Sequence, residues 1–266
     1  MSKIAIIGSG NIGLSLGKGL VKSEQYAAQE IILTRRNLAL LQHEARLGFQ
    51  VGDNNSQAVL ASDIVVLAVL PQQLKRVLDE IKGSLNDQQI IVSVVSGVTC
   101  EDIRNVIGEE MQVVRAMPNT AIVIGQSMTC IATDLASTEA VSSVVKLFES
   151  VGSVVVIQED LMTSATALCA CGIAFFLRAI RAASQGGVEI GFHAHDALKM
   201  AVQTAKGAAD LLLQTSSHPE HEIDKVTSPK GCTIAGLNEM EHHGFSSAFI
   251  KGIKLSAKKA GGLYDE

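Results

Sequence analysis

The chain has 266 residues, of which 47% are hydrophobic, 18% are charged and only 3% are aromatic, and its formal net charge is −5. This much apolar material can build one large domain or two modest ones, so wholesale disorder is excluded. The charge balance lacks the basic excess of duplex-binding proteins. Aromatic side chains are also too few for a single-strand stacking platform, so no nucleic-acid partner is expected.

The mean hydropathy of +0.28 is high for a soluble protein. The longest apolar runs, such as Ile64–Leu70 and Leu168–Leu177, are shorter than the roughly 20 apolar residues of a membrane span. The segment Met1–Gly8 has neither the basic region nor the cleavage site of a signal peptide. We therefore expect no membrane partner and a cytoplasmic location, and we assign the surplus hydrophobicity to a subunit interface.

Cysteine and histidine patterns give no metal signal. The five cysteines are odd in number, and the spacing Cys169-x-Cys171 matches no zinc motif. The seven histidines lack metal-binding spacings as well. We predict free, buried thiols and no metal site.

The first half of the sequence alternates short apolar runs with amphipathic segments, which is the pattern of repeated βα units. The apolar runs predict strands at Lys3–Gly8, Glu30–Thr34, Phe49–Val51, Asp63–Val69, Gln89–Val94, Gln112–Met117, Gly125–Thr133 and Val154–Ile157. Apolar residues at helical spacing predict helices at Asn11–Lys22, Leu38–Arg46, Ser56–Leu60, Leu74–Ile81, Cys100–Ile107 and Ser137–Ser150. Continuous apolar strands favour an α/β fold with a doubly wound, mainly parallel sheet.

Beyond Glu159 the sequence has no strand signal and is predicted to be all-α. Ser228-Pro229 is typical of an N-cap followed by proline at the first helical position. The chain therefore divides into predicted domains 1–158 and 159–266. The predicted helices of the second domain are Leu161–Gly186, Phe192–Gln214, Ile234–Glu241 and Ser246–Lys259, with Ser216–Asp224 as a polar loop.

The segment Gly8–Gly13 reads Gly-Ser-Gly-Asn-Ile-Gly and has the GxGxxG spacing between a predicted strand and a predicted helix. Gly8 permits the tight turn, Gly10 lets a pyrophosphate approach the backbone, and Gly13 permits close helix–sheet packing. The N–H groups at the helix start can hold phosphates, so Asn11 and Ile12 join the candidate cofactor residues. A glycine-rich turn without a ligand is the alternative.

The end of the second predicted strand carries Thr34-Arg35-Arg36-Asn37 instead of the acidic residue that binds the ribose of NAD. Guanidinium groups match phosphate geometry and stack on adenine, so Thr34, Arg35 and Arg36 favour NADPH, with NADH also considered. Two solvated surface arginines are the alternative.

Six segments together resemble the pyrroline-5-carboxylate reductase family. Those segments are IAIIGSGNIG at the N-terminus, Asp53–Asn55, Ser62–Leu74, Ser93–Val98, Val113–Thr129 and Val226–Leu237. The resemblance implies reduction of 1-pyrroline-5-carboxylate to L-proline by NAD(P)H. It also implies a Rossmann-type domain followed by a helical dimerisation domain, with homodimers that in several members assemble into decamers.

The resemblance also implies roles for individual residues. Ser228 and the backbone at Gly231, Cys232 and Thr233 match the positions that hold the substrate carboxylate, and the Thr233 hydroxyl matches the group near the ring nitrogen. A simple capped helix is the alternative for that block. Positions that line the cofactor in the family correspond here to Asn55, Ala68, Val69, Pro71 and Asn119.

Three departures from the family pattern bear on the substrate. Leu70 stands where the family often has Lys, and Cys169–Phe175 replaces a Ser-Gly-Ser-Gly-Pro-Ala-Tyr stretch. Lys230 replaces the first Gly of Ser-Pro-Gly-Gly, where it is either exposed or close to the carboxylate. A related imine or keto-acid reductase and a non-catalytic NADP-binding paralogue therefore stay as alternatives.

Overall fold

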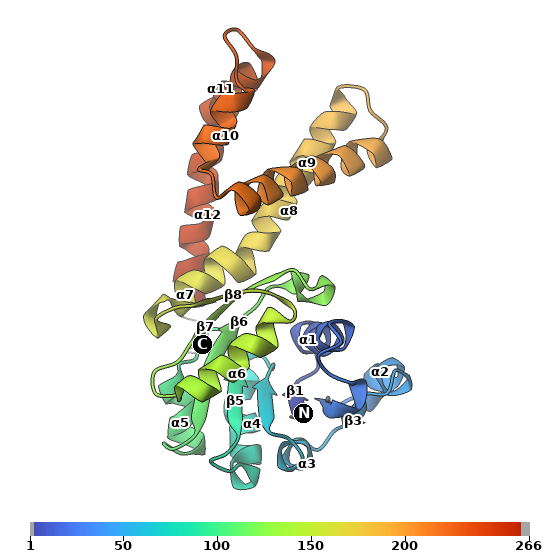
Figure 1. The fold of residues 1–266 in the computed structure, drawn as a ribbon, viewed down its shortest axis with the longest axis vertical. Helices are drawn as coiled ribbons and strands as arrows, with labels where there is room; N and C mark the ends of the chain where they lie inside the picture. Colours follow the sequence, from blue (N-terminus) through green and yellow to red (C-terminus); the bar gives the residue numbers. More distant parts are fainter. Residues whose placement is uncertain (1–2, 262–266) are drawn as a thin grey trace. The chain divides into compact units, whose positions relative to one another are not determined.

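The computed structural model describes residues 3–261 and divides the chain into two compact units. The first unit runs to Cys171 and also includes the segment that begins at Leu255, and the second unit is Gly172–Lys254. Each unit has its own architecture (Figure 1).

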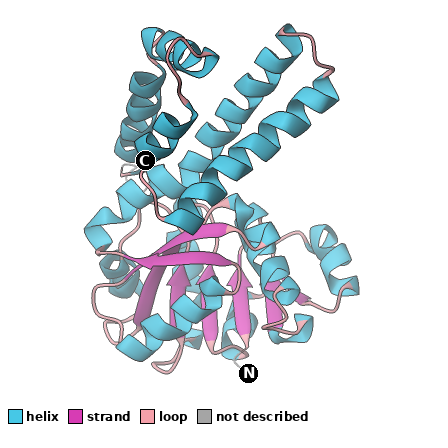
Figure 2. Ribbon diagram, turned by 45° about the horizontal axis from the view of Figure 1, so that its top comes forward, coloured by secondary structure: helices cyan, strands magenta, loops and turns pink. Residues whose placement is uncertain are grey.

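The first unit is built on one eight-stranded sheet, drawn in magenta in Figure 2, with the order β3-β2-β1-β4-β5-β6-β7-β8. All neighbouring strands are parallel except the antiparallel pair β6 and β7. The predicted α/β fold with a mainly parallel sheet is confirmed. The strands are β1 (Ile4–Ile7), β2 (Ile31–Thr34), β3 (Gln50–Gly52), β4 (Ile64–Leu67), β5 (Ile90–Ser93), β6 (Gln112–Met117), β7 (Ser127–Ala132) and β8 (Gly152–Val156).

The central strands are buried on both faces, as their continuous apolar sequences predict, whereas the edge strand β8 is largely exposed. In β1, Ile4 and Ile6 face a core that includes residues of α1 and α6, whereas Ala5 and Ile7 face a core that includes residues of α3, α4 and α5. This alternation follows the two-residue period of a strand, and each fully buried isoleucine contributes about 1.5–3 kcal/mol. The helices are α1 (Asn11–Lys22), α2 (Gln42–Arg46), α3 (Asn55–Leu60), α4 (Pro71–Ile81), α5 (Cys100–Ile107) and α6 (Thr138–Glu149).

The second unit is helical. Its helices α8 and α9 pack against each other, and a Cβ atom on Gly187 of α8 would lie 3.0 Å from Ala197 Cβ of α9. Many large apolar side chains on these helices are exposed, including Phe176 and Leu213, which are 59% and 80% exposed. The helices are α8 (Gly172–Glu189), α9 (Ala194–Thr215), α10 (Pro219–Val226), α11 (Cys232–His242) and α12 (Phe245–Ala260).

The polar segment Ser216–Asp224 was predicted to be a loop, and that prediction is wrong because α10 forms there. Pro219 occupies the first turn, and the ring of His218 accepts a hydrogen bond from the Glu220 N–H at 3.3 Å. Local capping and the Lys225–Glu222 ion pair support this helix without an apolar stripe.

The predicted helix Leu161–Gly186 forms with an interruption. A short α7 (Met162–Ala165) leads into a π-helical turn, Thr166–Cys171, and α8 follows. The helical stretch Glu159–Glu189 has 31 residues and a window of mean hydropathy 1.6, so its length and composition suit a membrane span. The expectation that no segment reaches that length is therefore wrong here, although a helix covered by protein satisfies the same criteria.

The five cysteines are free, as predicted, but only Cys100 and Cys130 are buried. Cys169 and Cys171 are half-buried and Cys232 is exposed, so the expectation of uniform burial is wrong. The π-helical turn and the start of α11 present these three side chains to their surroundings.

Candidate functional site

A hollow of about 790 Å³ opens at the carboxyl ends of β1, β2 and β4. The strand order reverses between β1 and β4, and open α/β sheets bind ligands outside the strand ends at such a point. The lining residues are Ile7, Gly8, Ser9, Gly10, Asn11, Ile12, Thr34, Arg35, Arg36, Asn37, Leu40, Asn55, Ala68, Val69, Leu70, Gln73, Arg76 and Val77.

The three glycines of the fingerprint have different surroundings. Gly8 has φ +92°, and a Cβ there would lie 2.5 Å from Val69 Cγ1. A Cβ on Gly13 would lie 2.7 Å from the Gly8 carbonyl oxygen, so α1 packs closely on the turn. A Cβ on Gly10 would meet no protein atom within 4 Å, so packing does not demand glycine there. Room for a ligand at the N-terminus of α1 is the remaining reason for glycine at this position.

Thr34 and Arg35 hold the glycine turn in place. The buried Thr34 hydroxyl accepts a hydrogen bond from the Gly8 N–H at 3.4 Å, and the Thr34 carbonyl accepts one from the Ser9 N–H at 2.9 Å. Arg35 Nη1 donates to the Ser9 carbonyl at 3.2 Å. Arg35 therefore supports the loop, whereas Arg36 is exposed at the same strand end.

The charge of the hollow is strongly positive. Its lining includes Arg35, Arg36 and Arg76, and no aspartate or glutamate. Such a lining fits a nucleotide with an additional phosphate better than one whose ribose needs a carboxylate partner. Sequence reasoning missed Arg76 and Gln73, which lie one turn apart on α4 and belong to no local motif.

The structure places ten of the predicted cofactor residues on the hollow: Gly8, Gly10, Asn11, Ile12, Thr34, Arg35, Arg36, Asn55, Ala68 and Val69. Gly13, Pro71 and Asn119 are not among the lining residues. Pro71 begins α4. Asn119 caps a 3₁₀ turn, accepting from the Ala121 N–H at 3.1 Å and donating to the Cys169 carbonyl at 3.4 Å. The Asn55 amide also has a protein partner, Glu80, at 3.1 Å.

The predicted substrate residues lie together in the second unit, at the start of α11. The helix begins at Cys232, so the predicted helix start around Gly231–Thr233 is confirmed, but its N-cap is Gly231 and not Ser228. Instead Ser228–Gly231 forms a turn, closed by the Gly231 N–H donating to the Ser228 carbonyl at 2.9 Å. Lys230 adopts φ +61°, a left-handed conformation that a helix does not continue through.

Gly231 is required by the shape of this turn. A Cβ there would lie 2.6 Å from Ser228 Oγ and 2.9 Å from the Ser228 carbonyl oxygen. No side chain caps α11, so the N–H groups of Cys232 and Thr233 lie at an uncapped helix start, where the helix dipole favours an anion. Ser228 and Cys232 are exposed, and Thr233 is half-buried.

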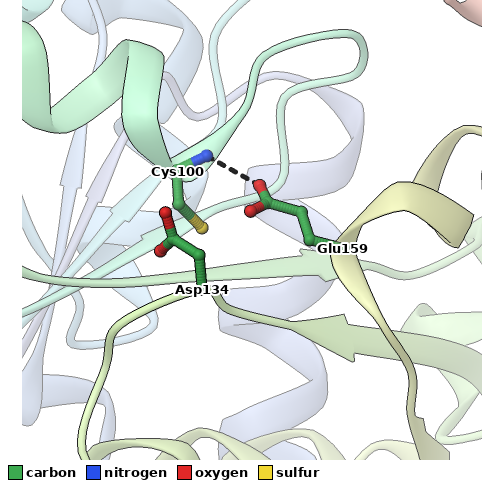
Figure 3. A group of neighbouring side chains, drawn as sticks. All are labelled: Cys100, Asp134 and Glu159. Atoms are coloured by element: carbon green, nitrogen blue, oxygen red, sulfur yellow. Dashed lines mark hydrogen bonds between the residues drawn. The ribbon is translucent and has the colours of Figure 1, made fainter.

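A second cluster of reactive groups joins α5, the loop after β7 and the 3₁₀ turn before α7. Figure 3 shows Cys100, Asp134 and Glu159, whose potential ligand atoms lie within 4.8 Å of one another. Arg104 forms a two-pronged ion pair with Asp134, and Arg115 Nη1 lies 3.2 Å from Glu159 Oε1.

The chemistry of this cluster is that of a structural junction. Glu159 accepts a hydrogen bond from the Cys100 N–H at 2.7 Å, and burial, with Glu159 nearby, raises the pKa of the Cys100 thiol to about 12. The Arg104 hydrogen bond lowers the pKa of Asp134. Because both carboxylates are neutralised by guanidinium groups and the thiol is protonated, the cluster favours ion pairing over metal binding.

Two family descriptions match the sequence. Residues 159–263 match pyrroline-5-carboxylate reductase dimerisation, and residues 3–97 match the NADP oxidoreductase, coenzyme F420-dependent family.

Curated relatives cover nearly the whole chain. Pyrroline-5-carboxylate reductase 1 of Dictyostelium discoideum is 52% identical over 99% of this chain, which spans about half (50%) of that relative's length. Pyrroline-5-carboxylate reductase 2 of the same organism is 48% identical, covering 97% of this chain and 91% of the relative. The Arabidopsis thaliana enzyme is 32% identical, covering 97% and 94%.

Solved structures give the same picture. The pyrroline-5-carboxylate reductase of Coxiella burnetii has a TM-score of 0.89 and 28% identity, with 98% of both chains covered. The Plasmodium falciparum pyrroline carboxylate reductase, solved with NADP bound, has a TM-score of 0.92 at 22% identity, covering 99% of this chain and 98% of that one. At that identity the second similarity concerns the fold.

Proposed function

Because this chain belongs to the pyrroline-5-carboxylate reductase family, we propose that it reduces 1-pyrroline-5-carboxylate to L-proline, the last step of proline biosynthesis, with NADPH as the reductant. The observation that carries the proposal is the hollow lined by arginines, in which Gly10 has free space around its Cα. The same chain has an anion-binding helix start at α11, just after Ser228.

The chain's own residues suit the cofactor. The N–H groups at the start of α1 bind the pyrophosphate, and Gly10 lets it approach. Arg36, assisted by Arg35, pairs with the 2′-phosphate. When bound, NADPH supplies the hydride that the imine carbon receives. NADH lacks the 2′-phosphate and is the weaker partner.

The turn and helix start at Ser228–Thr233 suit the substrate. The Ser228 hydroxyl and the free N–H groups of Cys232 and Thr233 bind the carboxylate, and Gly231, whose own N–H donates to the Ser228 carbonyl, lets it approach the backbone. The Thr233 hydroxyl hydrogen-bonds the ring nitrogen and assists its protonation, which makes the imine a better hydride acceptor. Carbon gains the hydride and nitrogen gains the proton, so no further acid–base pair is required.

The activity assay is the loss of NADPH absorbance with purified protein and 1-pyrroline-5-carboxylate, repeated with NADH. We expect turnover with both cofactors and a lower KM for NADPH. Absence of turnover with either cofactor refutes the proposal. Cofactor binding by calorimetry without turnover on any imine would identify a non-catalytic NADP-binding paralogue instead.

Thr233→Val tests the hydroxyl, because valine keeps the shape and loses the hydrogen bond. We expect kcat to fall about a hundredfold, the usual contribution of a positioned proton donor, with an unchanged circular dichroism spectrum. Thr233→Ser, which retains the hydroxyl, is the matched control and should keep most of the activity. Equal kcat values for the two variants would refute the role of Thr233.

Arg36→Ala tests the cofactor phosphate site. A hydrogen bond to a charged group is worth about 1.5–3 kcal/mol, so the Kd for NADPH should rise roughly 10- to 100-fold. The Kd for NADH should stay nearly constant, because it has no 2′-phosphate. A parallel loss for both cofactors would contradict the assignment. Arg36 is the better position to change, since Arg35 also supports the glycine turn.

A related imine or keto-acid reductase is the second candidate function. It is favoured by Cys169–Phe175, which lacks the family's hydroxyls and proline, and by Lys230 in place of glycine. A panel of cyclic imines and keto acids, compared by kcat/KM, separates the two candidates.

We also propose a homodimer formed through the C-terminal helices. Helices α8 and α9 border an apolar hollow of about 710 Å³, lined by residues such as Phe176, Met200 and Val202, and a second copy would cover it. Covering by a subunit, rather than by a membrane, accounts for the apolar stretch Glu159–Glu189, and we propose a cytoplasmic location for the dimer. Light scattering tests the dimer, and a mass of ten chains would show the further assembly into a decamer.

A further inference from the structure

Two cysteines of the first unit face each other, and neither lines the proposed cofactor hollow. Cys130 lies on β7 and Cys169 on the π-helical turn Thr166–Cys171, and their sulfur atoms are 3.7 Å apart. A disulfide needs about 2.0 Å between sulfurs, so the two sulfur atoms must approach each other by about 1.7 Å to bond. From this geometry we propose that Cys130 and Cys169 form a reversible, peroxide-oxidised disulfide.

The two thiols differ in burial, so that one can be reached by an oxidant while the other is shielded. Cys130 is only 6% exposed and lies in a small apolar cluster with Met117, Ala132 and Met162. Cys169 packs against the edge of that cluster and is half-buried, so it is the sulfur that a small oxidant reaches. Cys169 is therefore the attacking thiol and Cys130 the resolving one.

Hydrogen bonding between the thiols supports this order. Either sulfur can donate this hydrogen bond; when Cys130 donates, the bond lowers the pKa of Cys169, and the same bond together with burial raises the pKa of Cys130. The thiolate is the nucleophilic form of cysteine, so Cys169 reacts first at neutral pH. Cys100 is buried, with a thiol that stays protonated, and it has no part in the reaction.

Each step of the oxidation balances. The Cys169 thiolate attacks one oxygen of hydrogen peroxide, the O–O bond breaks, and the products are the sulfenic acid and hydroxide. The Cys130 thiol then attacks that sulfur, and the S–O bond breaks. The hydroxyl group leaves with the Cys130 proton as water, and the S–S bond forms. A dithiol reductant restores both thiols.

The crosslink would act on a segment that has a further link to the sheet. The Cys169 carbonyl accepts the hydrogen bond from Asn119, in the turn after β6. A bond between β7 and the π-helical turn would fix that turn at a second point. π-Helical turns are rare and frequently lie at functional sites, so restraint there is a route for a redox signal.

The test uses the full-length, reduced protein, exposed to a small excess of hydrogen peroxide and then alkylated with a maleimide at acidic pH. We expect the count of free thiols to fall from five to three and non-reducing peptide mapping to show one Cys130–Cys169 crosslink, reversed by dithiothreitol. Five remaining thiols, or a crosslink that joins Cys169 to another cysteine, would overturn the proposal.

Variants assign the two roles. Cys130→Ser should stop at a Cys169 sulfenic acid that dimedone labels, and Cys169→Ser should remain unoxidised. Cys171→Ser, two residues from Cys169 on the same turn, is the matched control and should still form the crosslink. If either pair variant fails to fold, the wild-type map and the Cys171→Ser map decide the question, independently of the reductase activity.

Discussion

Replacing Lys230 with glycine should stabilise the protein, because Lys230 has φ +61° in the turn that precedes α11. A left-handed conformation costs a residue with a Cβ about 1–2 kcal/mol, and glycine is free of that cost. Glycine loses more backbone entropy on folding, roughly 0.5–1 kcal/mol relative to alanine. Within residues 3–261 the exposed Lys230 side chain forms no ion pair, so little else is lost. The net expectation is a gain of about 0.5–1 kcal/mol.

Lys230→Ala separates backbone strain from loss of charge. Alanine removes the ammonium group and keeps the Cβ, so its stability should equal or fall slightly below that of the wild type. A gain of about 1 kcal/mol raises the melting temperature of a chain of this size by roughly 2–4 °C. Thermal melts followed by circular dichroism, with all three proteins side by side, measure the difference. Equal melting temperatures for the glycine and alanine variants would refute the strain argument.

Three further predictions concern the first unit. Gly13→Ala places a Cβ 2.7 Å from the Gly8 carbonyl and should destabilise the fold by about 1–3 kcal/mol, measured by urea unfolding. Gly10→Ala meets no protein atom and should leave stability nearly unchanged while weakening NADPH binding tenfold or more; the opposite pattern would contradict the proposed pyrophosphate position. Asp134→Asn leaves Arg104, 3% exposed, with the more distant Glu109 carboxylate at 3.9 Å in place of its closest anion, and should cost roughly 2–3 kcal/mol at neutral pH. Because the folded pKa of Asp134 is lowered, its carboxylate stabilises the fold at pH values above the ordinary aspartate pKa of about 3.9. That stabilisation is lost as the pH falls through the folded pKa, so the wild type and the variant should become equally stable in acid. Asp87→Asn, on an exposed loop, is the control and should show no such pH dependence.

The sheet was predictable because its strands carry their own signal. Residues Ile4–Ile7 and Ile64–Leu67 are apolar at every position, and in a parallel sheet both faces are buried. The fingerprint glycines likewise mark one local turn. In these places a short window of sequence contains the whole physical cause.

The remaining predictions depend on backbone geometry and hydrogen bonds that a short window of sequence does not reveal. Polarity suggested a loop where His218 and Pro219 begin α10, because capping rather than an apolar stripe supports that helix. Ser228-Pro229 fits a helix start equally well as a turn, and only the left-handed Lys230 decides between them. The prediction that Asn119 lines the cofactor stays a prediction, and its side chain also accepts from Ala121 and donates to Cys169.

The positive charge of the hollow is predictable from the sequence in part, and the rest of it depends on the assembled sheet. Arg35 and Arg36 are visible in sequence because they follow a strand at the expected distance from the glycines. Arg76 reaches the same hollow from α4, about 40 residues later, because the neighbouring strands β1 and β4 bring their carboxyl ends together. A sequence motif therefore predicts that a phosphate is bound, whereas the number of cations that face it depends on the strand order. The absence of any carboxylate in the lining, which favours the additional phosphate of NADPH, is likewise a property of the assembled sheet and not of either arginine segment alone.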